Sequence, residues 1–339
     1  MYAKLRDTLN LISKLTFTKL TNFFGLFFTF YVSRLFRKNL ICGMPISASI
    51  EPTTSCNLQC SECPSGQRNF NRATGMLNFE NFKIYFDGLK RELIYLNIYF
   101  QGEPLLNKEF CKMVKYAGDS GIYTSTSTNA HFLNTKVSEQ IVNSGLDRLI
   151  ISIDGATAQS YSIYRKGGTF EKVIEGTKNI LNARNKLNSL KPYIIWQFII
   201  FKHNEHEIDL IKKMANEYQV DKLKFKTAQI YNLSNENEAL LPENSKYSRY
   251  EKNEGFKIKN RLMNHCWRMW QGCVITWNGY VVPCCFDKDA EYKFGKIENS
   301  NFTEIWKNDK YKKFRKEILK SRKNIDICRN CSEGSKIWI

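Results

Sequence analysis

The chain has 339 residues, of which 42% are hydrophobic and 25% are charged. This composition is typical of a globular protein, and it excludes a fibrous repeat or a largely disordered chain. The length suits one large domain, or a large domain with a small one. Lys and Arg number 51 against 33 Asp and Glu, which gives a net charge of +18. That excess favours an anionic partner: nucleic acid, a phosphorylated substrate or a lipid surface.

Residues 1–44 form a basic, aromatic-rich N-terminal segment that is predicted to be helical. It contains seven Lys and Arg residues and a single acid, Asp7, around a Phe-rich stretch at residues 22–33. The stretch is too short to span a bilayer, which takes roughly 20 apolar residues. Two interpretations remain open: a helix that lies in the interface of a membrane, and a helix that packs on the outside of the main domain.

From residue 45 to residue 230, β-branched runs alternate with helical patterns. Strands are predicted at 45–51, 95–100, 122–127, 148–153, 194–200 and 222–226. Helices are predicted between them at 79–91, 107–118, 134–145, 169–187 and 205–218. Such alternation predicts an α/β fold with a parallel sheet and right-handed crossovers. Six units of this kind, rather than eight, predict an open partial (β/α)6 barrel.

The rest of the chain divides into two segments. Residues 231–262 are rich in Asn, Glu, Lys and Ser, and we interpret them as a polar linker with at most a short helix. Residues 263–339 are rich in Cys, Trp and Lys and leave little room for another parallel unit. We expect them to form a small second domain.

Eleven cysteines are present, and nine of them fall into two groups. Clustered thiols in a chain of this size indicate metal or iron–sulfur ligands in a reducing compartment, so we expect a cytoplasmic protein. The first group, Cys56, Cys60 and Cys63, has the spacing C-x3-C-x2-C directly after the first predicted strand. Three thiolates on one loop can hold a 4Fe–4S cluster and leave the fourth iron without a protein ligand. Zinc is the alternative, but no His stands nearby.

This loop resembles the cluster-binding loop of the radical S-adenosylmethionine (SAM) superfamily. Segments 100–104, 127–130 and 151–155 resemble the superfamily's GGEP, S-T-N-G and S-x-D-G motifs in the same order. The resemblance implies SAM contacts from Gly102, Glu103, Asn129, Ser152 and Arg165. Two positions depart from the pattern. Gln101 replaces the first Gly of the GGEP motif, and Glu62 replaces the aromatic residue that usually precedes the third cluster cysteine and stacks near the adenine.

The second group of cysteines resembles the ligand set of an auxiliary cluster domain. Cys266 is followed by twelve residues, Gly279, four residues and Cys284, and later by the pair Cys328 and Cys331. This arrangement resembles the twitch domain, the shortened form of the SPASM domain, and implies a second 4Fe–4S cluster on these four cysteines. Four thiolates also suit zinc, and that alternative stays open.

Two cysteines of the second group, Cys273 and Cys285, remain outside this ligand set. Cys285 directly follows a predicted ligand. We consider it a candidate hydrogen-atom donor to a substrate radical, with a small buried hydrophobe as the alternative.

The resemblance also implies a reaction type. The reduced cluster cleaves SAM to a 5′-deoxyadenosyl radical that abstracts a substrate hydrogen atom, and the auxiliary cluster can then accept an electron. An electron donor such as flavodoxin or ferredoxin is the implied partner. The 44 residues before the core cannot form the winged-helix domain that peptide maturases often carry. We therefore expect an oxidoreductase or epimerase that acts on a sugar-like, phosphorylated or lipid-linked substrate.

Two alternatives accompany this hypothesis. The first is a radical SAM peptide maturase, which modifies a ribosomal peptide or a protein side chain. The second is a non-catalytic iron–sulfur or zinc protein that binds nucleic acid through its positive charge. No nucleic-acid-binding module is visible in the sequence.

Overall fold

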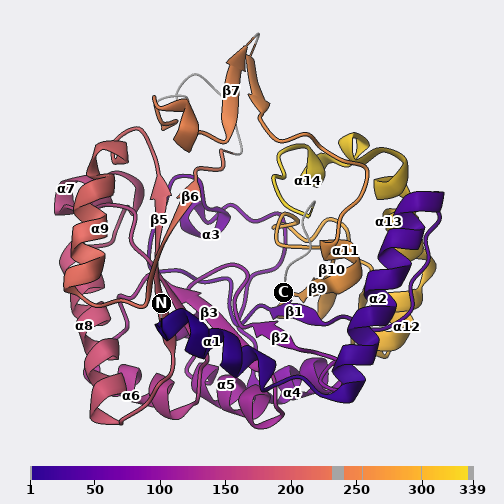
Figure 1. The fold of residues 1–339 in the computed structure, drawn as a ribbon, viewed down its shortest axis with the longest axis horizontal. Coiled ribbons are helices and arrows are strands. Elements are labelled where there is room, and N and C mark those ends of the chain that lie inside the picture. Colours follow the sequence, from indigo (N-terminus) through magenta and orange to yellow (C-terminus); the bar gives the residue numbers. More distant parts are fainter. Residues whose placement is uncertain (1, 231–239, 254, 299, 335–339) are drawn as a thin grey trace.

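Figure 1 shows the computed structural model, which describes residues 2–230, 240–253, 255–298 and 300–334. Its centre is a nine-stranded sheet in the order β11-β10-β9-β1-β2-β3-β4-β5-β6. Strands β1 to β6 run parallel to their neighbours in this sheet. The sheet curves into an open barrel with its helices on the outside (Figure 1), so the predicted fold class is confirmed.

All six predicted strands are present. They are β1 Ser47–Ile50, β2 Tyr95–Asn97, β3 Tyr123–Thr128, β4 Arg148–Ser152, β5 Tyr193–Ile200 and β6 Lys222–Thr227. Because the strands are parallel, their carboxyl ends meet at one end of the barrel, where the loops that follow them form a site.

The predicted helices are also present, and one more, α7, lies between β4 and β5. They are α4 Phe79–Asp87, α5 Phe110–Asp119, α6 Thr135–Asn143, α7 Ala158–Tyr164, α8 Phe170–Lys186 and α9 Ile208–Glu217. Asn78 and Asn134 begin α4 and α6, since each side chain accepts a hydrogen bond from a backbone N–H of the first turn.

The remaining helical elements occur mainly in the loops and in the C-terminal part. They are α3 Pro64–Gln67, α11 Arg268–Gln271, α12 Phe302–Lys307, α13 Asp309–Ser321 and α14 Asp326–Arg329, with 3-10 turns η1 Pro104–Leu106, η2 Glu205–Glu207, η3 Ser245–Tyr247 and η4 Arg322–Asn324.

The C-terminal part joins the same sheet. Strand β9, Gly272–Ile275, pairs parallel with β1, and β10 Tyr280–Val282 and β11 Gly295–Lys296 follow in antiparallel pairs. The sequence analysis left little room for such a parallel strand, because β9 has only four residues and the helix directly before it, α11, also has only four. The division at residue 263 remains a prediction, but the sheet is continuous across it.

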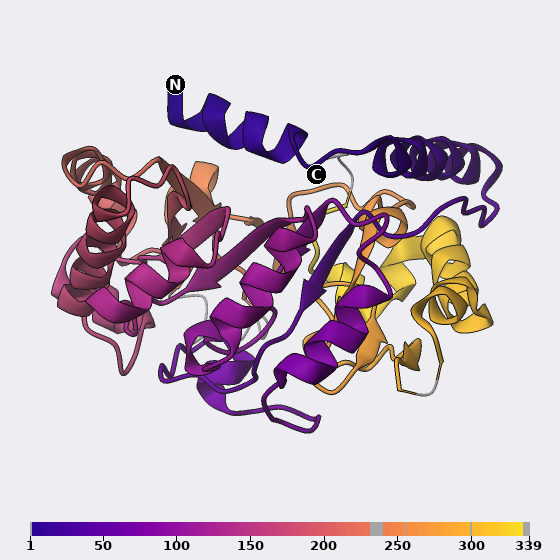
Figure 2. The same cartoon turned by 90° about the horizontal axis from the view of Figure 1, so that it is seen from below.

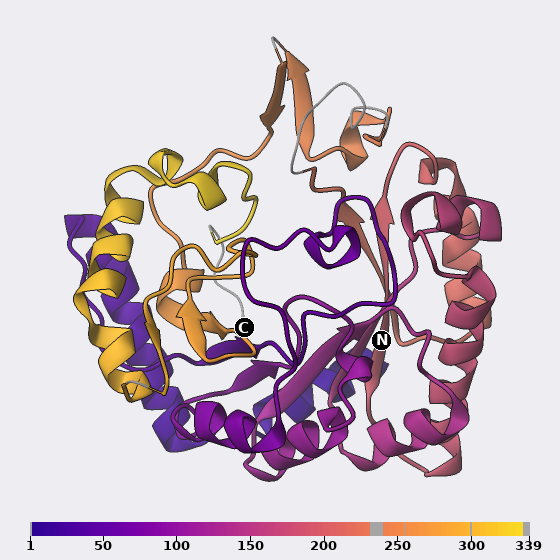
Figure 3. The same cartoon turned by 180° about the vertical axis from the view of Figure 1, so that it is seen from behind.

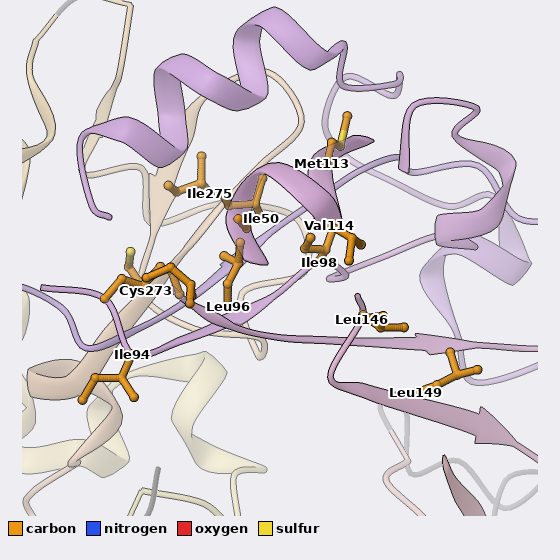
Figure 4. Packing of buried hydrophobic residues seen from close by; sticks show 14 of the residues in the cluster. Ile50, Ile94, Leu96, Ile98, Met113, Val114, Leu146, Leu149, Cys273 and Ile275 are labelled. Carbon is orange, nitrogen blue, oxygen red and sulfur yellow. The ribbon is translucent and has the colours of Figure 1, made fainter. Parts of the chain in front are cut away.

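One hydrophobic core lies under this sheet. Figure 4 shows Ile50, Leu96 and Met113 beside Ile275 and Cys273 in one packed cluster. The cluster therefore combines barrel residues with residues of the C-terminal part. Its continuity means that the C-terminal part is held to the barrel by buried apolar area as well as by strand pairing.

The predicted linker contains a β-hairpin. Strands β7 Tyr250–Asn253 and β8 Gly255–Ile258 pair antiparallel and project from the rim of the molecule (Figure 1). The sequence analysis missed this hairpin because no run of buried β-branched residues marks it. The buried Tyr250 hydroxyl donates to Asn330 Oδ1 at 2.7 Å, which ties the hairpin to the C-terminal part. The predicted linker residues 231–239 lie outside the described residues.

The N-terminal segment forms two helices, α1 Tyr2–Ile12 and α2 Phe17–Phe36, which lie along one side of the molecule (Figure 2). The buried Asp7 of α1 pairs with Arg148 and accepts a hydrogen bond from the Tyr123 hydroxyl, both at the amino end of the barrel. Leu26 and Phe30 of α2 are buried in the core. Both helices therefore pack on the main domain, and no helix among the described residues is long and apolar enough to cross a membrane.

Candidate active site

The first cysteine loop follows β1 at the carboxyl ends of the strands and faces the viewer in Figure 3. Cys60 is buried, whereas Cys56 and Cys63 are partly exposed. The Cys63 N–H donates to the Cys60 carbonyl at 3.2 Å, and α3 begins directly after Cys63. A Cβ at Gly66 would lie 2.6 Å from the Cys60 nitrogen, so only glycine allows α3 to pack this closely on the loop.

The three thiols lie close enough for their charges to interact. Burial is the main cause that raises the pKa of Cys56 to about 11, and charges on Glu103, Cys63 and Cys60 contribute to this rise. Two polar groups counter this effect: Arg165 Nη1 lies 3.7 Å from the Cys60 sulfur, and Asn129 Nδ2 lies 3.9 Å from the Cys56 sulfur. A positive charge and an amide donor beside the sulfurs fit thiolate ligands, which must lose their protons to bind iron.

Gly102 lies against the cysteine loop in a conformation that requires glycine. Its φ is +73°, and an added Cβ would lie 2.5 Å from the Thr53 carbonyl oxygen. The Gly102 N–H donates to Ser65 Oγ at 2.8 Å. The second Gly of the GGEP-like motif is therefore needed here, although Gln101 replaces the first.

Glu103 is buried in the loop after β2, and its side chain forms hydrogen bonds with residues at the end of β3. Its carboxylate accepts hydrogen bonds from Thr128 Oγ1 at 2.7 Å and from the Asn129 N–H at 2.8 Å. Burial raises the pKa of Glu103 despite these donors. Asn129 Nδ2 in turn donates to Asn57 Oδ1 at 2.8 Å. Two predicted SAM residues thus lie together beside the cluster loop.

Arg165 is held in place by Asp154, whose role the sequence analysis did not assign. Arg165 Nε donates to Asp154 Oδ2 at 2.6 Å, and the Ile199 N–H donates to the other carboxylate oxygen at 2.7 Å. Asp154 is fully buried and raises the pKa of Arg165, which stays charged. Ser152, the last residue of β4, is two residues before Asp154 on the same side of the barrel end. The S-x-D spacing was the signal that could have identified Asp154 as the positioning residue.

The four predicted ligands of the second group also come together. The pKa of Cys328 is raised to about 11 and that of Cys331 to about 12, mainly by burial and in part by the charge of Cys266. Cys284 interacts in the same way with Cys266 and Cys331. Such a set of four thiols fits a closed 4Fe–4S site.

A buried arginine that the sequence analysis missed lies beside this second group. Arg322 Nη2 donates to the Cys331 sulfur at 3.1 Å and to the Glu333 carbonyl at 2.8 Å. Its place in a lysine-rich helical stretch gave no signal for this role, because the stretch reads as a solvated face.

Neither site shows coordination geometry for a single ion. Among the described residues, no three or more His, Cys, Asp or Glu side chains are spaced to hold one metal ion. The ligands are therefore assigned from the donor sets and from the charges around them.

The two remaining cysteines differ from each other. Cys273 lies in the core, where burial raises its pKa to about 12, so it acts as a small hydrophobe. Cys285 is exposed, and Arg268 Nη1 lies 3.9 Å from its sulfur. Lys288 is near both Cys285 and Cys63, whose charges raise its pKa, but burial dominates and lowers it to about 8. Cys285 therefore lies on the side that faces the cluster loop, and its donor role remains a prediction.

An open α/β barrel with three thiols after its first strand, a buried polar site beside them and four further thiols defines an iron–sulfur enzyme class. Residues 50–214 match the family model of the radical SAM superfamily, and residues 266–332 match that of the iron–sulfur cluster-binding SPASM domain. The chain belongs to the radical SAM superfamily and carries a SPASM domain. Its cofactors are accordingly SAM and 4Fe–4S clusters, and the non-catalytic hypothesis is not supported.

Several characterised proteins are similar to this chain. The mycofactocin maturase MftC of Mycobacterium ulcerans is 28% identical over 51% of this chain and 45% of its own length. The PqqA peptide cyclase of Bradyrhizobium diazoefficiens is 26% identical over 59% of this chain and 50% of its own length. The chain thus spans about half the length of these two relatives. A tungsten-containing aldehyde ferredoxin oxidoreductase cofactor-modifying protein of Pyrococcus furiosus is 23% identical over 84% of this chain and 86% of its own length.

Solved structures share the fold. Streptococcus suis SuiB bound to its precursor peptide SuiA has a TM-score of 0.61 at 15% identity and covers 90% of this chain and 74% of SuiB. BtrN in complex with AdoMet and 2-DOIA has a TM-score of 0.52 at 19% identity and covers 88% of this chain and 95% of BtrN.

Proposed function

We propose that the chain is a radical SAM enzyme that oxidises a peptide or protein side chain. Two clusters of thiols carry the proposal: three in the loop after β1 and four in the C-terminal part. The strands of both parts belong to one continuous sheet. Of the relatives with more than 25% identity, one is named as a peptide cyclase, which acts on PqqA, and another as a mycofactocin maturase. This favours the peptide maturase hypothesis over the sugar-like substrate expected from sequence.

The residues around the first loop have distinct roles in this proposal. The three cysteines hold a 4Fe–4S cluster, and Gly102, Glu103, Asn129, Ser152 and Arg165 bind SAM. When bound, these groups supply a 5′-deoxyadenosyl radical that removes a hydrogen atom from the substrate. Arg165 is oriented by Asp154, which holds its guanidinium charge in place beside the cysteine loop. Gly102 brings the backbone close to the loop without a side chain in the way.

The second group of thiols would close a cluster that takes up the second electron. Cys266, Cys284, Cys328 and Cys331 would hold this cluster, which would supply a one-electron acceptor. With the loss of one hydrogen atom, one electron and one proton, the product would have two hydrogens fewer than the substrate. The reducing partner for the first step is a one-electron donor of the flavodoxin or ferredoxin class.

A sugar-like or phosphorylated substrate is the second candidate. It is favoured by Arg268 and Lys288, which place two cations near Cys285 and Cys63. Cations at this position suit a phosphate or carboxylate group of the substrate. An acidic peptide would pair with the same two cations. The cations therefore indicate an anionic group on the substrate, whether it is a sugar or a peptide.

A two-pool assay tests the proposal. Anaerobically reconstituted protein receives reductant and SAM, with either short peptides encoded beside its gene or a set of nucleotide-linked and lipid-linked sugars. Formation of 5′-deoxyadenosine should rise with a peptide, and the peptide should lose the mass of two hydrogens. A rise only with a sugar, or a product of unchanged mass, would overturn the peptide oxidation.

A further inference from the structure

We propose that α1 and α2 form a docking face for an anionic lipid bilayer, and that the cavity at their turn receives a lipid phosphate group. The inference does not depend on the substrate of the enzyme, because the face lies at the opposite end of the barrel from the cysteine loop.

The first observation is a concentration of exposed apolar side chains. Twelve of the eighteen large apolar side chains that are exposed among the described residues lie within residues 2–40. They are Tyr2, Leu5, Leu9, Ile12, Phe17, Leu20, Phe24, Phe28, Tyr31, Leu35, Phe36 and Leu40. Exposed patches of this kind mark interaction sites in proteins that are otherwise well packed.

These side chains follow helical periodicity. On α2, Phe17, Phe24, Phe28 and Leu35 recur at intervals of four and seven residues and are between 62% and 83% exposed. Such spacing places them on one face of the helix. The opposite face of α2 is buried, where Phe30 packs 5.2 Å from the Trp267 ring centre and 5.4 Å from that of Trp270. Because the inner face of α2 is packed, the exposed apolar side chains on its other face point away from the protein.

Helix α1 is oriented in the same manner. Asp7 fixes its inner face through the ion pair with Arg148, and Asn10 Nδ2 donates to Asp147 Oδ1 at 2.8 Å. The exposed Leu5 and Leu9 are on its outer face. Because α1 and α2 lie on the same side of the molecule in Figure 2, their two outer faces form one surface.

The second observation is the charge around this surface. Residues 1–44 carry seven basic residues, and their single acid, Asp7, is paired internally with Arg148. A cavity of about 630 Å³ lies at the turn between α1 and α2, and its basic lining residues are Lys14, Lys19, Lys90 and Arg91. No acidic residue is among the described residues that line it, and Lys90 and Arg91 pair with Asp87 and Glu92 outside the lining. An apolar face with a basic rim is the pattern of a helix at an anionic membrane surface.

Charge also argues against a second copy of this chain as the occupant. A symmetric dimer through this face would bring the basic rims of both copies together, and like charges disfavour association. An anionic lipid surface would instead neutralise the positive charges of this rim. The cysteine loop faces the viewer in Figure 3, whereas α1 and α2 lie behind the barrel, so docking leaves the loop accessible.

Co-sedimentation of the reconstituted full chain with vesicles tests this proposal. The vesicles contain phosphatidylcholine either alone or mixed with phosphatidylserine. The first variant combines Phe17→Ser, Phe24→Ser, Phe28→Ser and Leu35→Ser. Its control carries four changes at exposed apolar positions elsewhere, which are 37% to 59% exposed: Ile84→Ser, Leu187→Ser, Leu190→Ser and Leu210→Ser. We expect binding to mixed vesicles to fall about a hundredfold in the first variant and to remain in the control.

A charge variant separates the lipid phosphate from general apolar binding. Lys14→Gln, Lys90→Gln and Arg91→Gln, which change basic residues that line the cavity, should weaken binding to the mixed vesicles by roughly fivefold per residue. The matched control is Lys136→Gln, Lys186→Gln and Lys213→Gln, whose side chains are exposed on other helices.

Two results would overturn the proposal. One is wild-type protein that sediments no more with mixed vesicles than the four-serine variant does. The other is a wild-type dimer in sedimentation velocity that becomes monomeric in that variant while vesicle binding is unchanged, which would identify the face as a contact between two copies. Loss of 5′-deoxyadenosine formation would concern the proposed reaction and not this surface.

Discussion

The two cysteine sites of this protein differ in number and surroundings. The loop after β1 has three thiols, and polar groups from Asn129 and Arg165 approach their sulfurs at 3.9 and 3.7 Å. The C-terminal site has four thiols, of which Cys266, Cys328 and Cys331 are buried, and a buried arginine. A cluster with three protein ligands keeps one iron open to a small molecule, whereas four ligands close it. The difference teaches that the first site can perform chemistry on SAM while the second is suited to electron transfer.

Among the changes that distinguish the two sites, Cys56→Ala should have the largest effect on activity. With two thiols left, the loop cannot hold a cluster firmly, so 5′-deoxyadenosine formation in the presence of reductant should fall to background. Chromatography of the reaction mixture measures this product. The exposed Cys42, which belongs to neither group, provides the control variant Cys42→Ala. Full activity of Cys56→Ala would refute the assignment of the first site.

Replacing all three cysteines of the first site allows the iron content of the second site to be measured alone. In the variant with Cys56, Cys60 and Cys63 changed to Ala, iron and sulfide should fall from about eight to about four atoms of each per chain. The remaining atoms report the C-terminal site by itself. A value near zero, with zinc bound instead, would show that the second site has no role in electron transfer.

Asp154→Asn tests how the first site binds SAM. The change removes the counter-ion of the largely buried Arg165, which costs about 3–5 kcal/mol for a buried pair. We expect the Kd for SAM to rise at least about tenfold while the iron content of the loop stays the same. Calorimetric titration and iron analysis give the two readouts. Asp119→Asn, which alters an exposed pair with Lys115, is the control, and unchanged SAM affinity in Asp154→Asn would contradict the positioning role.

Arg322→Gln should have the smallest effect and should act on the second site alone. The substitution removes charged hydrogen bonds to the Cys331 sulfur and the Glu333 carbonyl, each of which contributes about 1.5–3 kcal/mol. We expect a lower Tm and faster loss of C-terminal iron, measured in the triple-cysteine variant. Arg329→Gln, at an exposed position on α14, should show neither change. Equal iron retention in both variants would show that Arg322 has no part in this site.

Local patterns were sufficient to predict the barrel. Strands such as β5 are rich in β-branched residues, and helices such as α6 begin at an Asn cap, so short-range physical preferences identify both. Cysteine spacing also predicts both ligand sets, and these stay predictions. The first set lies on one loop, whereas the second extends from Cys266 to Cys331. The hairpin of β7 and β8 and the four-residue strand β9 were missed, since their pairing depends on partners far away in the chain.

The sequence by itself determined the fold class and the superfamily, because the strand and helix patterns and the motifs at strand ends are local. The cysteine ligand sets stay predictions from spacing. Only the tertiary structure decided that β9 continues the barrel sheet, that Asp154 holds Arg165 and that Arg322 lies beside the C-terminal thiols. It also decided that α1 and α2 are buried on one face and exposed on the other. These features depend on which distant surfaces meet when the chain packs, and hydrophobic periodicity alone cannot say what a helix face will contact.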